Sequence, residues 1–160
     1  MFLLDTNICI YFMKNLYPHL TEKILSYDPS ALMISSVTVF ELSYGAEKSN
    51  WGERNKQKLA MFLAPFKILP FTADDAVTAG KIRSYLEKLG TPVGPYDLQI
   101  AAQGLAKNLT LVTHNTGEFK RVPNLKLEDW IKLTHPPPVT PNWMRDALFF
   151  KDPIFTNFHI

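Results

Sequence analysis

The chain has 160 residues, of which 46% are hydrophobic and 12% aromatic, enough apolar material for one globular domain with a buried core. Its formal net charge of +2 provides no large basic field, so charge neither demands nor excludes a nucleic-acid partner. A single cysteine excludes an intrachain disulfide, and no apolar run approaches the ~18 residues of a membrane span. We therefore expect a soluble, cytoplasmic protein with no membrane partner.

Short apolar runs alternate with helical patterns along most of the chain, as is typical of βαβ units and a parallel sheet. In chain order, the predicted elements are a strand at residues 2–5, helices at 7–14 and 16–27, a strand at 31–36, helices at 37–48 and 54–64, a strand at 67–71, helices at 73–89 and 96–108, a strand at 109–113 and an edge strand at 125–130. Ser36 is the predicted cap of the helix at 37–48, and Thr72 of the helix at 73–89. The order predicts a three-layer α/β/α sandwich around a mainly parallel sheet of four to five strands.

The composition changes near the C-terminus. Residues 134–160 contain five of the twelve prolines and five large aromatic side chains, and they show no regular period. Three consecutive prolines favour an extended segment, whereas the aromatic side chains are unusual for a disordered tail. We interpret residues 1–133 as one domain and residues 134–160 as a C-terminal extension that packs on an apolar surface of this domain or of a partner.

Polar side chains recur where the predicted strands end. Asp5 ends the first strand, and Glu41 lies in the second turn of the helix that leaves the second strand. Asn115 and Glu118 follow the fourth strand, and Asp97 opens the helix after the loop "GTPVGP". Because ligands bind outside the carboxyl ends of parallel strands, we expect the side chains that follow strands to share one rim of the sheet. Asp97 joins them if the loop before it delivers its helix N-terminus there.

Each acid also has a purely structural explanation. Asp5 can cap a helix, Asp97 can favour a helix N-terminus, and Glu41 can be solvated. Three carboxylates at one rim would repel one another, by roughly 4 kcal/mol for two charges ~4 Å apart, and a divalent cation removes that repulsion. Oxygen ligands without paired histidines or cysteines favour Mg²⁺ or Mn²⁺, and such sites perform phosphoryl chemistry.

Four segments of the chain together resemble one known family. They read "LLDTNICIYF", "SSVTVFELSYGAEKS", "GTPVGPYDLQIAA" and "LVTHNTGEFKRVPNLKLEDW", and they resemble the PIN domain of VapC toxins from bacterial toxin–antitoxin pairs. The resemblance covers about residues 1–133. It implies an Mg²⁺- or Mn²⁺-dependent endoribonuclease that cleaves RNA, with tRNA as a family-level expectation. It also implies inhibition by a VapB-type antitoxin, through which alone the protein would contact DNA.

The same resemblance assigns roles to individual residues. It places the acidic triad and the metal ligands on Asp5, Glu41 and Asp97. Asn115 stands where many PIN domains have a fourth acid, so either Asn115 or Glu118 completes the catalytic set. The polar residues that it adds as neighbours of the site are Thr6, Ser36 and Thr113.

A homodimer is expected as well. The family forms dimers, and the predicted helices at 7–14 and 37–48 have more apolar surface than one small sheet can cover.

Three other classes of protein compete with this reading. A haloacid-dehalogenase-like phosphatase also begins with a strand ending in aspartate, but its pattern needs a second aspartate where this chain has Asn7. A receiver domain needs a phospho-accepting aspartate on a central strand and a lysine after a later strand, and neither is convincing here. A non-catalytic PIN-like module that binds RNA or a protein remains open, and a metal-dependent cleavage assay of the Asp5→Asn protein separates it from a nuclease.

Overall fold

The structure, a computed structural model, describes residues 1–50 and 52–132. The predictions for the extension at residues 134–160 therefore lie outside the described residues, and the boundary at residue 133 stays a prediction.

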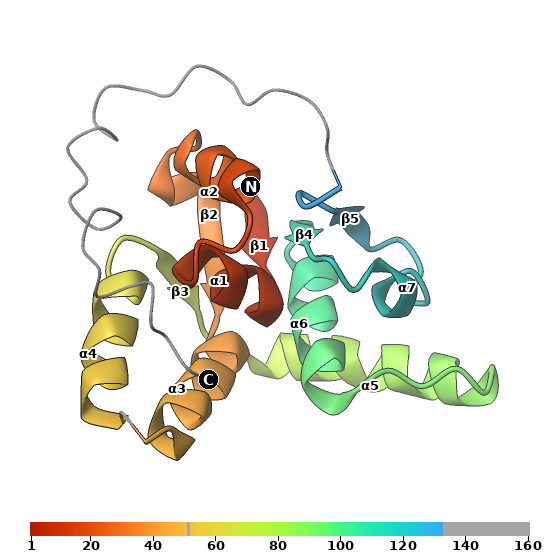
Figure 1. Ribbon diagram of the computed structural model, residues 1–160. Helices are drawn as coiled ribbons and strands as arrows, with labels where there is room; N and C mark the ends of the chain where they lie inside the picture. Colours follow the sequence, from red (N-terminus) through yellow and green to blue (C-terminus); the bar gives the residue numbers. More distant parts are fainter. Residues whose placement is uncertain (51, 133–160) are drawn as a thin grey trace.

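A five-stranded sheet forms the centre of the molecule (Figure 1). The elements are β1 (Phe2–Leu4), α1 (Thr6–Met13), α2 (Pro18–Leu25), the 3₁₀ turn η1 (Pro29–Ala31), β2 (Leu32–Ser35), α3 (Ser36–Lys48), α4 (Gly52–Leu63), β3 (Lys67–Leu69), α5 (Ala73–Lys88), α6 (Pro95–Ala106), β4 (Thr110–Val112), α7 (Thr116–Phe119) and β5 (Lys126–Glu128). The strand order is β3-β2-β1-β4-β5, and all four pairings are parallel. The predicted parallel sheet and its edge strand are confirmed.

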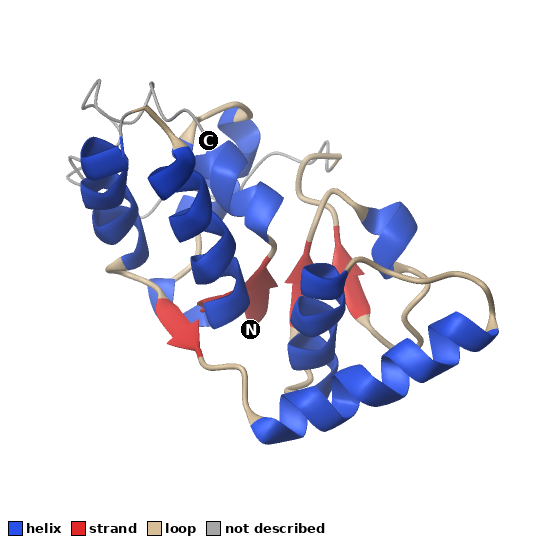
Figure 2. Cartoon of the chain, turned by 90° about the horizontal axis from the view of Figure 1, so that it is seen from below, coloured by secondary structure: helices blue, strands red, loops and turns tan. Residues whose placement is uncertain are grey.

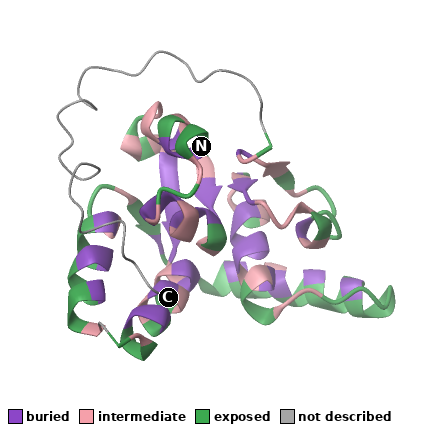
Figure 3. Ribbon diagram, in the orientation of Figure 1, coloured by how far each residue is buried: buried purple, intermediate pink, exposed green. Residues whose placement is uncertain are grey.

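Helices cover both faces of this sheet (Figure 2). Consecutive strand residues point to opposite faces, so Leu3 and Leu111 lie in the core beneath α5 and α6, whereas Leu4 and Val112 lie in the core with α1, α2 and α4. Strands β1, β2 and β4 are largely buried between these two layers, whereas the edge strands β3 and β5 are partly exposed (Figure 3). This is the predicted α/β/α sandwich, and its parallel strands read as continuous apolar runs because both faces are covered.

The start of α3 differs from the prediction. Ser35, not Ser36, is the N-cap: its Oγ accepts a hydrogen bond from the Val37 N–H at 3.0 Å. Ser36 is the first helical residue, and its hydroxyl accepts from the Phe71 N–H at 3.0 Å. The prediction was wrong by one residue because the two serines offer the same side chain, and only the backbone turn after β2 decides which of them caps.

The apolar surface of the helices is covered unevenly. The prediction of uncovered apolar surface is wrong for α1, which buries Ile8, Cys9 and Phe12 in the core. It holds for α3, where Phe40 is 51% and Tyr44 59% exposed. In the part of the chain that the structure describes, no helix is both long enough and apolar enough to cross a membrane.

Helix α5 begins with a complete capping box. Thr72 and Asp75 exchange hydrogen bonds: the Thr72 N–H donates to Asp75 Oδ2 at 2.8 Å, and the Asp75 N–H donates to Thr72 Oγ1 at 3.4 Å. The buried Asp75 also forms an ion pair with Lys107, which follows α6. These bonds fasten the start of α5 to the end of α6 and confirm Thr72 as the cap.

Removing Asp75 is therefore expected to destabilise the fold. Asp75→Ala deletes half of the capping box and leaves Lys107 without its buried partner, so the free energy of unfolding should fall by about 3 kcal/mol. Asp74→Ala, one residue earlier at an exposed position of the same turn, is the matched control and should cost less than about 1 kcal/mol. Urea unfolding of the two variants measures the difference, and equal losses would contradict the assignment.

Candidate active site

Asp5 lies at the carboxyl end of β1 and combines two tasks. Its Oδ1 accepts from the Thr6 N–H at 2.8 Å, which makes it the N-cap of α1, and its Oδ2 accepts from the Thr113 hydroxyl at 2.8 Å. The side chain is only 2% exposed. Burial raises the pKa of Asp5 to about 7; the hydrogen bond from Thr113 lowers it, and the charges of Asp97 and Glu41 raise it further. Asp5 is thus a helix cap, as one of its two explanations predicts, and its role as a site acid stays a prediction.

Glu41 lies in the second turn of α3, as predicted, and is half-buried. The hydroxyl of Thr6, the first residue of α1, donates to Glu41 Oε2. Thr6 Oγ1 also lies 3.2 Å from the hydroxyl of Thr38, which the sequence analysis did not single out. Because Thr6 has one hydroxyl proton and the carboxylate has none, Thr6 donates to Glu41 and accepts from Thr38. This chain of bonds fixes the orientation of Glu41.

Asp97 lies in the first turn of α6. Its Oδ2 accepts from Asn115 Nδ2 at 3.3 Å, so the residue in the position of the fourth acid contacts the triad as an amide donor. Burial raises the pKa of Asp97 to about 6, the charges of Glu118 and Glu41 raise it further, and the bond from Asn115 lowers it. The "GTPVGP" loop therefore delivers this helix N-terminus to the rim, as expected.

Glu118 and Ser36 occupy different surroundings from the triad. Both Glu118 oxygens are bonded: Oε1 accepts from the Gly94 N–H at 2.8 Å and Oε2 from Asn115 Nδ2 at 2.9 Å, and these bonds lower its pKa. The hydroxyl of Ser36 accepts a hydrogen bond from the Phe71 N–H, in the loop after β3. Thr113, in contrast, bonds both Asp5 and the Asn115 N–H.

The acids influence one another across three elements. Asp97 and Glu41 both raise the pKa of Asp5, and Glu41 raises that of Asp97, so the three charges lie within electrostatic range of each other. Helix α3, which carries Glu41, contacts both α1 and α6 (Figure 1). A buried carboxyl with a raised pKa next to further carboxylates is typical of a functional site.

The donor set suits a hydrated divalent cation. Across residues 1–50 and 52–132, no three acidic, histidine or cysteine side chains are close enough to hold a metal ion by themselves. Mg²⁺, however, keeps several of its waters and binds directly to one or two carboxylates, and all the donors here are oxygens. The chemistry of the donor set therefore fits Mg²⁺ or Mn²⁺ better than Zn²⁺.

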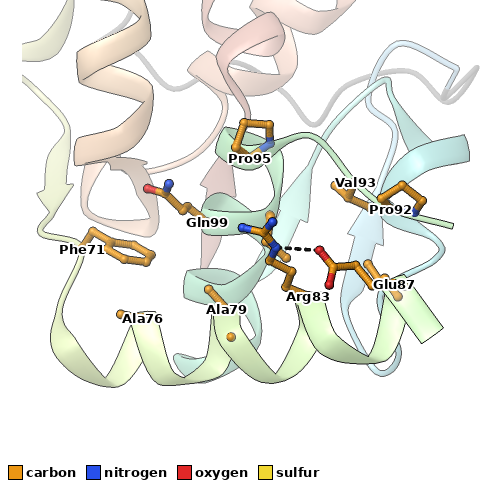
Figure 4. A pocket seen from close by; sticks show the side chains of 12 residues that line it. Phe71, Ala76, Ala79, Arg83, Glu87, Pro92, Val93, Pro95 and Gln99 are labelled. Carbon is orange, nitrogen blue, oxygen red and sulfur yellow. Dashed lines mark hydrogen bonds and ion pairs between the residues drawn. The ribbon is translucent and has the colours of Figure 1, made fainter. Parts of the chain in front are cut away.

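A separate cavity of about 580 Å³ lies between α5 and α6 (Figure 4). Ala76, Ala79 and Leu86 of α5 and Leu98 of α6 form apolar parts of its wall, and Arg83 and Glu87 form an exposed ion pair beside them. No candidate acid lines the cavity. The cavity and the candidate acids are therefore separate features of the molecule.

Two groups near the rim were missed from the sequence. Thr38 supports Thr6, and the backbone N–H of Gly94 binds Glu118. The sequence contained a signal for the Gly94 contact. Gly94 directly precedes the helix that opens with Pro95, and glycine has no side chain that could cap this helix. A helix start of this kind needs acceptors from another part of the chain.

A parallel sheet whose carboxyl edge gathers these acids has the architecture of a PIN-type nuclease. The family model of the PIN domain matches residues 2–125, and the chain belongs to this family.

Its relatives within the family are VapC ribonucleases. The chain is 43% identical over 129 residues to the tRNA(fMet)-specific endonuclease VapC of Salmonella typhimurium, which covers 81% of this chain and 97% of that protein. It is 42% identical over 133 residues to Ribonuclease VapC2 of Rickettsia felis, covering 82% and 98%. The crystal structure of DNA-bound VapBC from Salmonella typhimurium superposes with a TM-score of 0.76 at 43% identity, covering 81% of this chain and 97% of that one. The protein is thus a PIN-domain ribonuclease of the VapC type.

This assignment decides between the competing classes. The predicted VapC resemblance is confirmed, and the phosphatase and receiver-domain readings are wrong. VapC nucleases of this family are in general metal-dependent, in agreement with the oxygen donors at the rim.

Proposed function

We propose that this protein is the toxin of a toxin–antitoxin pair, which cleaves RNA in the cytoplasm with Mg²⁺ or Mn²⁺ and so inhibits translation and growth. The observation that carries the proposal is the set of three electrostatically coupled carboxylates, Asp5, Glu41 and Asp97, on three separate elements at one edge of the sheet. Each of them is oriented by a hydroxyl or amide partner. These three acids would hold the cation.

The residues around the acids have supporting roles. A cation bound there would supply an activated water and stabilise negative charge on the phosphate. Thr113 and Thr6 orient Asp5 and Glu41, and Asn115 orients Asp97. The raised pKa values of Asp5 and Asp97 mean that both carboxyls lose their protons most readily when a cation binds.

We propose structured RNA as the substrate, and an initiator tRNA as the first candidate. Support comes from the Salmonella relative, whose name describes it as specific for tRNA(fMet).

For partners, we propose a VapB-type antitoxin and a second copy of this chain. The similar solved structure is a DNA-bound VapBC complex, in line with DNA contacts that this protein makes only through the antitoxin. The exposed Phe40 and Tyr44 of α3 offer apolar surface for a homodimer, which light scattering at micromolar concentration would detect.

Sequencing of RNA ends tests the proposed activity and substrate. The wild-type chain, expressed without an antitoxin, should produce new 5′ ends at one or a few positions in tRNA, with the initiator tRNA foremost. Asp5→Asn, expressed to the same level, is the control and should give the background pattern. Identical RNA ends in the two samples would rule out cleavage by these acids, and new ends confined to other RNAs would rule out the tRNA substrate.

A further inference from the structure

Glu118 binds the N-terminus of the helix that carries Asp97. Helix α6 starts after Gly94, the N-cap, and Asp97 is therefore its third residue, the N3 position. The N–H of Gly94 donates to Glu118 Oε1, which comes from α7, 24 residues further along the chain. The other oxygen, Oε2, accepts from Asn115, and the same Asn115 amide reaches Asp97.

An acid at N3 ordinarily caps its own helix. In a capping box, the N3 side chain accepts from the backbone N–H of the N-cap residue. Helix α5 of this same chain shows that arrangement, because Asp75 at N3 accepts from the Thr72 N–H. Asp97 occupies the corresponding position in α6, yet the N–H that it would accept is already taken by Glu118. The carboxylate of Asp97 faces Asn115 and the charges of the site instead.

We propose that Glu118 is a positioning residue: it caps α6 in place of Asp97 and thereby keeps the Asp97 carboxylate available at the active site. The role of Asp97 in this inference rests on the proposed function. Glu118 is assigned to the helix N-terminus, and it is therefore not a further metal ligand. Asn115 donates to both carboxylates and so holds the side chains of Glu118 and Asp97 in a fixed position relative to each other.

The proposal has a specific consequence for Glu118→Ala. The Gly94 N–H then loses its acceptor, and Asp97, three residues away at N3, can take it as Asp75 does in α5. Asp97 would be withdrawn from the site while the helix remains capped. A displacement of about 1 Å in a catalytic group can cost roughly 100-fold in rate, so we expect a loss of that size in kcat. The loss should come with little change in melting temperature.

Glu118→Gln is the variant that separates capping from metal ligation. Its amide oxygen can still accept from the Gly94 N–H, whereas its amide nitrogen cannot accept from Asn115, and the side chain has no charge to offer a cation. Under the proposal, Glu118→Gln retains kcat within about tenfold of the wild type and binds Mn²⁺, titrated alone in a calorimeter, with near wild-type affinity. If Glu118 were a metal ligand, Gln and Ala would weaken Mn²⁺ binding equally.

Amide hydrogen exchange of Gly94 gives a readout that needs no activity. In Glu118→Ala without metal, the Gly94 amide should remain protected, because Asp97 replaces the lost acceptor, and protection should disappear in Glu118→Ala/Asp97→Ala. Loss of protection in Glu118→Ala alone would overturn the exchange of caps.

A second-site change sharpens the test. Gly94 has φ −54° and ψ 149°, a conformation open to proline, which has no N–H. In Gly94→Pro/Glu118→Ala, residue 94 has no N–H from which Asp97 could accept a hydrogen bond, so Asp97 should stay at the site. The kcat should therefore be at least tenfold higher than that of Glu118→Ala. Absence of recovery, equal Mn²⁺ affinity of the Gln and Ala variants, or wild-type kcat in Glu118→Ala would each overturn the proposal.

A wild-type protein that cleaves no RNA would instead contradict the proposed function. In that case the hydrogen exchange of the Gly94 amide would still decide whether Glu118 caps α6.

Discussion

Asp5→Asn is expected to abolish RNA cleavage without harming the fold. Asparagine is as good an N-cap as aspartate, so its oxygen can keep the bond from the Thr6 N–H, and its amide can donate to the Thr113 hydroxyl. The substitution removes a buried charge that only a cation would compensate. Without the Asp5 charge the site would bind its cation poorly and lose several kcal/mol of transition-state stabilisation at the phosphate. This loss corresponds to a rate decrease of ~1,000-fold or more. Unfolding at pH 8 should show a stability equal to or above that of the wild type.

Asp28→Asn is the matched control for this change. Asp28 also caps a helical turn, by accepting from the Ser30 N–H at 2.8 Å, but it precedes β2 and thus lies at the amino edge of the sheet. Its replacement should leave cleavage at the wild-type rate. A fluorescent RNA assay with both variants separates loss of a cap from loss of a site acid, and full activity of Asp5→Asn would mean that the acids have been misassigned.

The metal-free protein should become less stable as the pH rises from 5 to 8, and a divalent cation should reverse this trend. The pKa of Asp5 is about 7 in the folded protein against 3.8 ordinarily, and that of Asp97 is about 6. Between the two values the folded state holds a proton that the unfolded state has lost, so raising the pH favours unfolding. For the buried Asp5 this amounts to about 1.4 kcal/mol per pH unit up to pH 7. Asp75 and Glu118, whose pKa values are lowered, act below this window.

Thermal melts in EDTA and in Mg²⁺ or Mn²⁺ at pH 5, 6, 7 and 8 measure this linkage. The stabilisation by the cation should be largest at pH 8, because protons compete with it at lower pH. In EDTA, cleavage should stop at every pH. Asp5→Asn should flatten the metal-free pH dependence and reduce the response to the cation. A wild-type protein whose stability rises from pH 5 to 8 in EDTA, or that cleaves RNA there, would contradict the metal site.

Local patterns in the sequence were sufficient for the order of all the elements except the short η1 and α7, which they did not predict. The apolar runs at residues 2–5 and 109–113 were recognisable as β1 and β4. A parallel strand that is buried on both faces appears in the sequence as a continuous apolar run. Thr72 caps α5 as predicted, since a threonine three residues before an acid is a local signal. Ser35 and Ser36 show the limit of such signals, because two equal caps in succession leave the start of α3 open by one residue.

The sequence by itself also determined that Asp5 and Glu41 would lie at one edge of the sheet. Both follow strand ends, and the rule that parallel strands end at one edge brings such residues together. Asp97 follows a helix and a loop, so its place at that edge was decided by the tertiary structure. The tertiary structure also decided the pKa values of these acids and their hydrogen-bond partners. The pKa of Asp5 depends on its burial and on the charges of two other elements, and no window of sequence contains these. The same holds for Glu118: nothing local to α6 shows that its N-cap is bound from α7, because that hydrogen bond joins residues 24 positions apart that only the folding of the chain brings into contact.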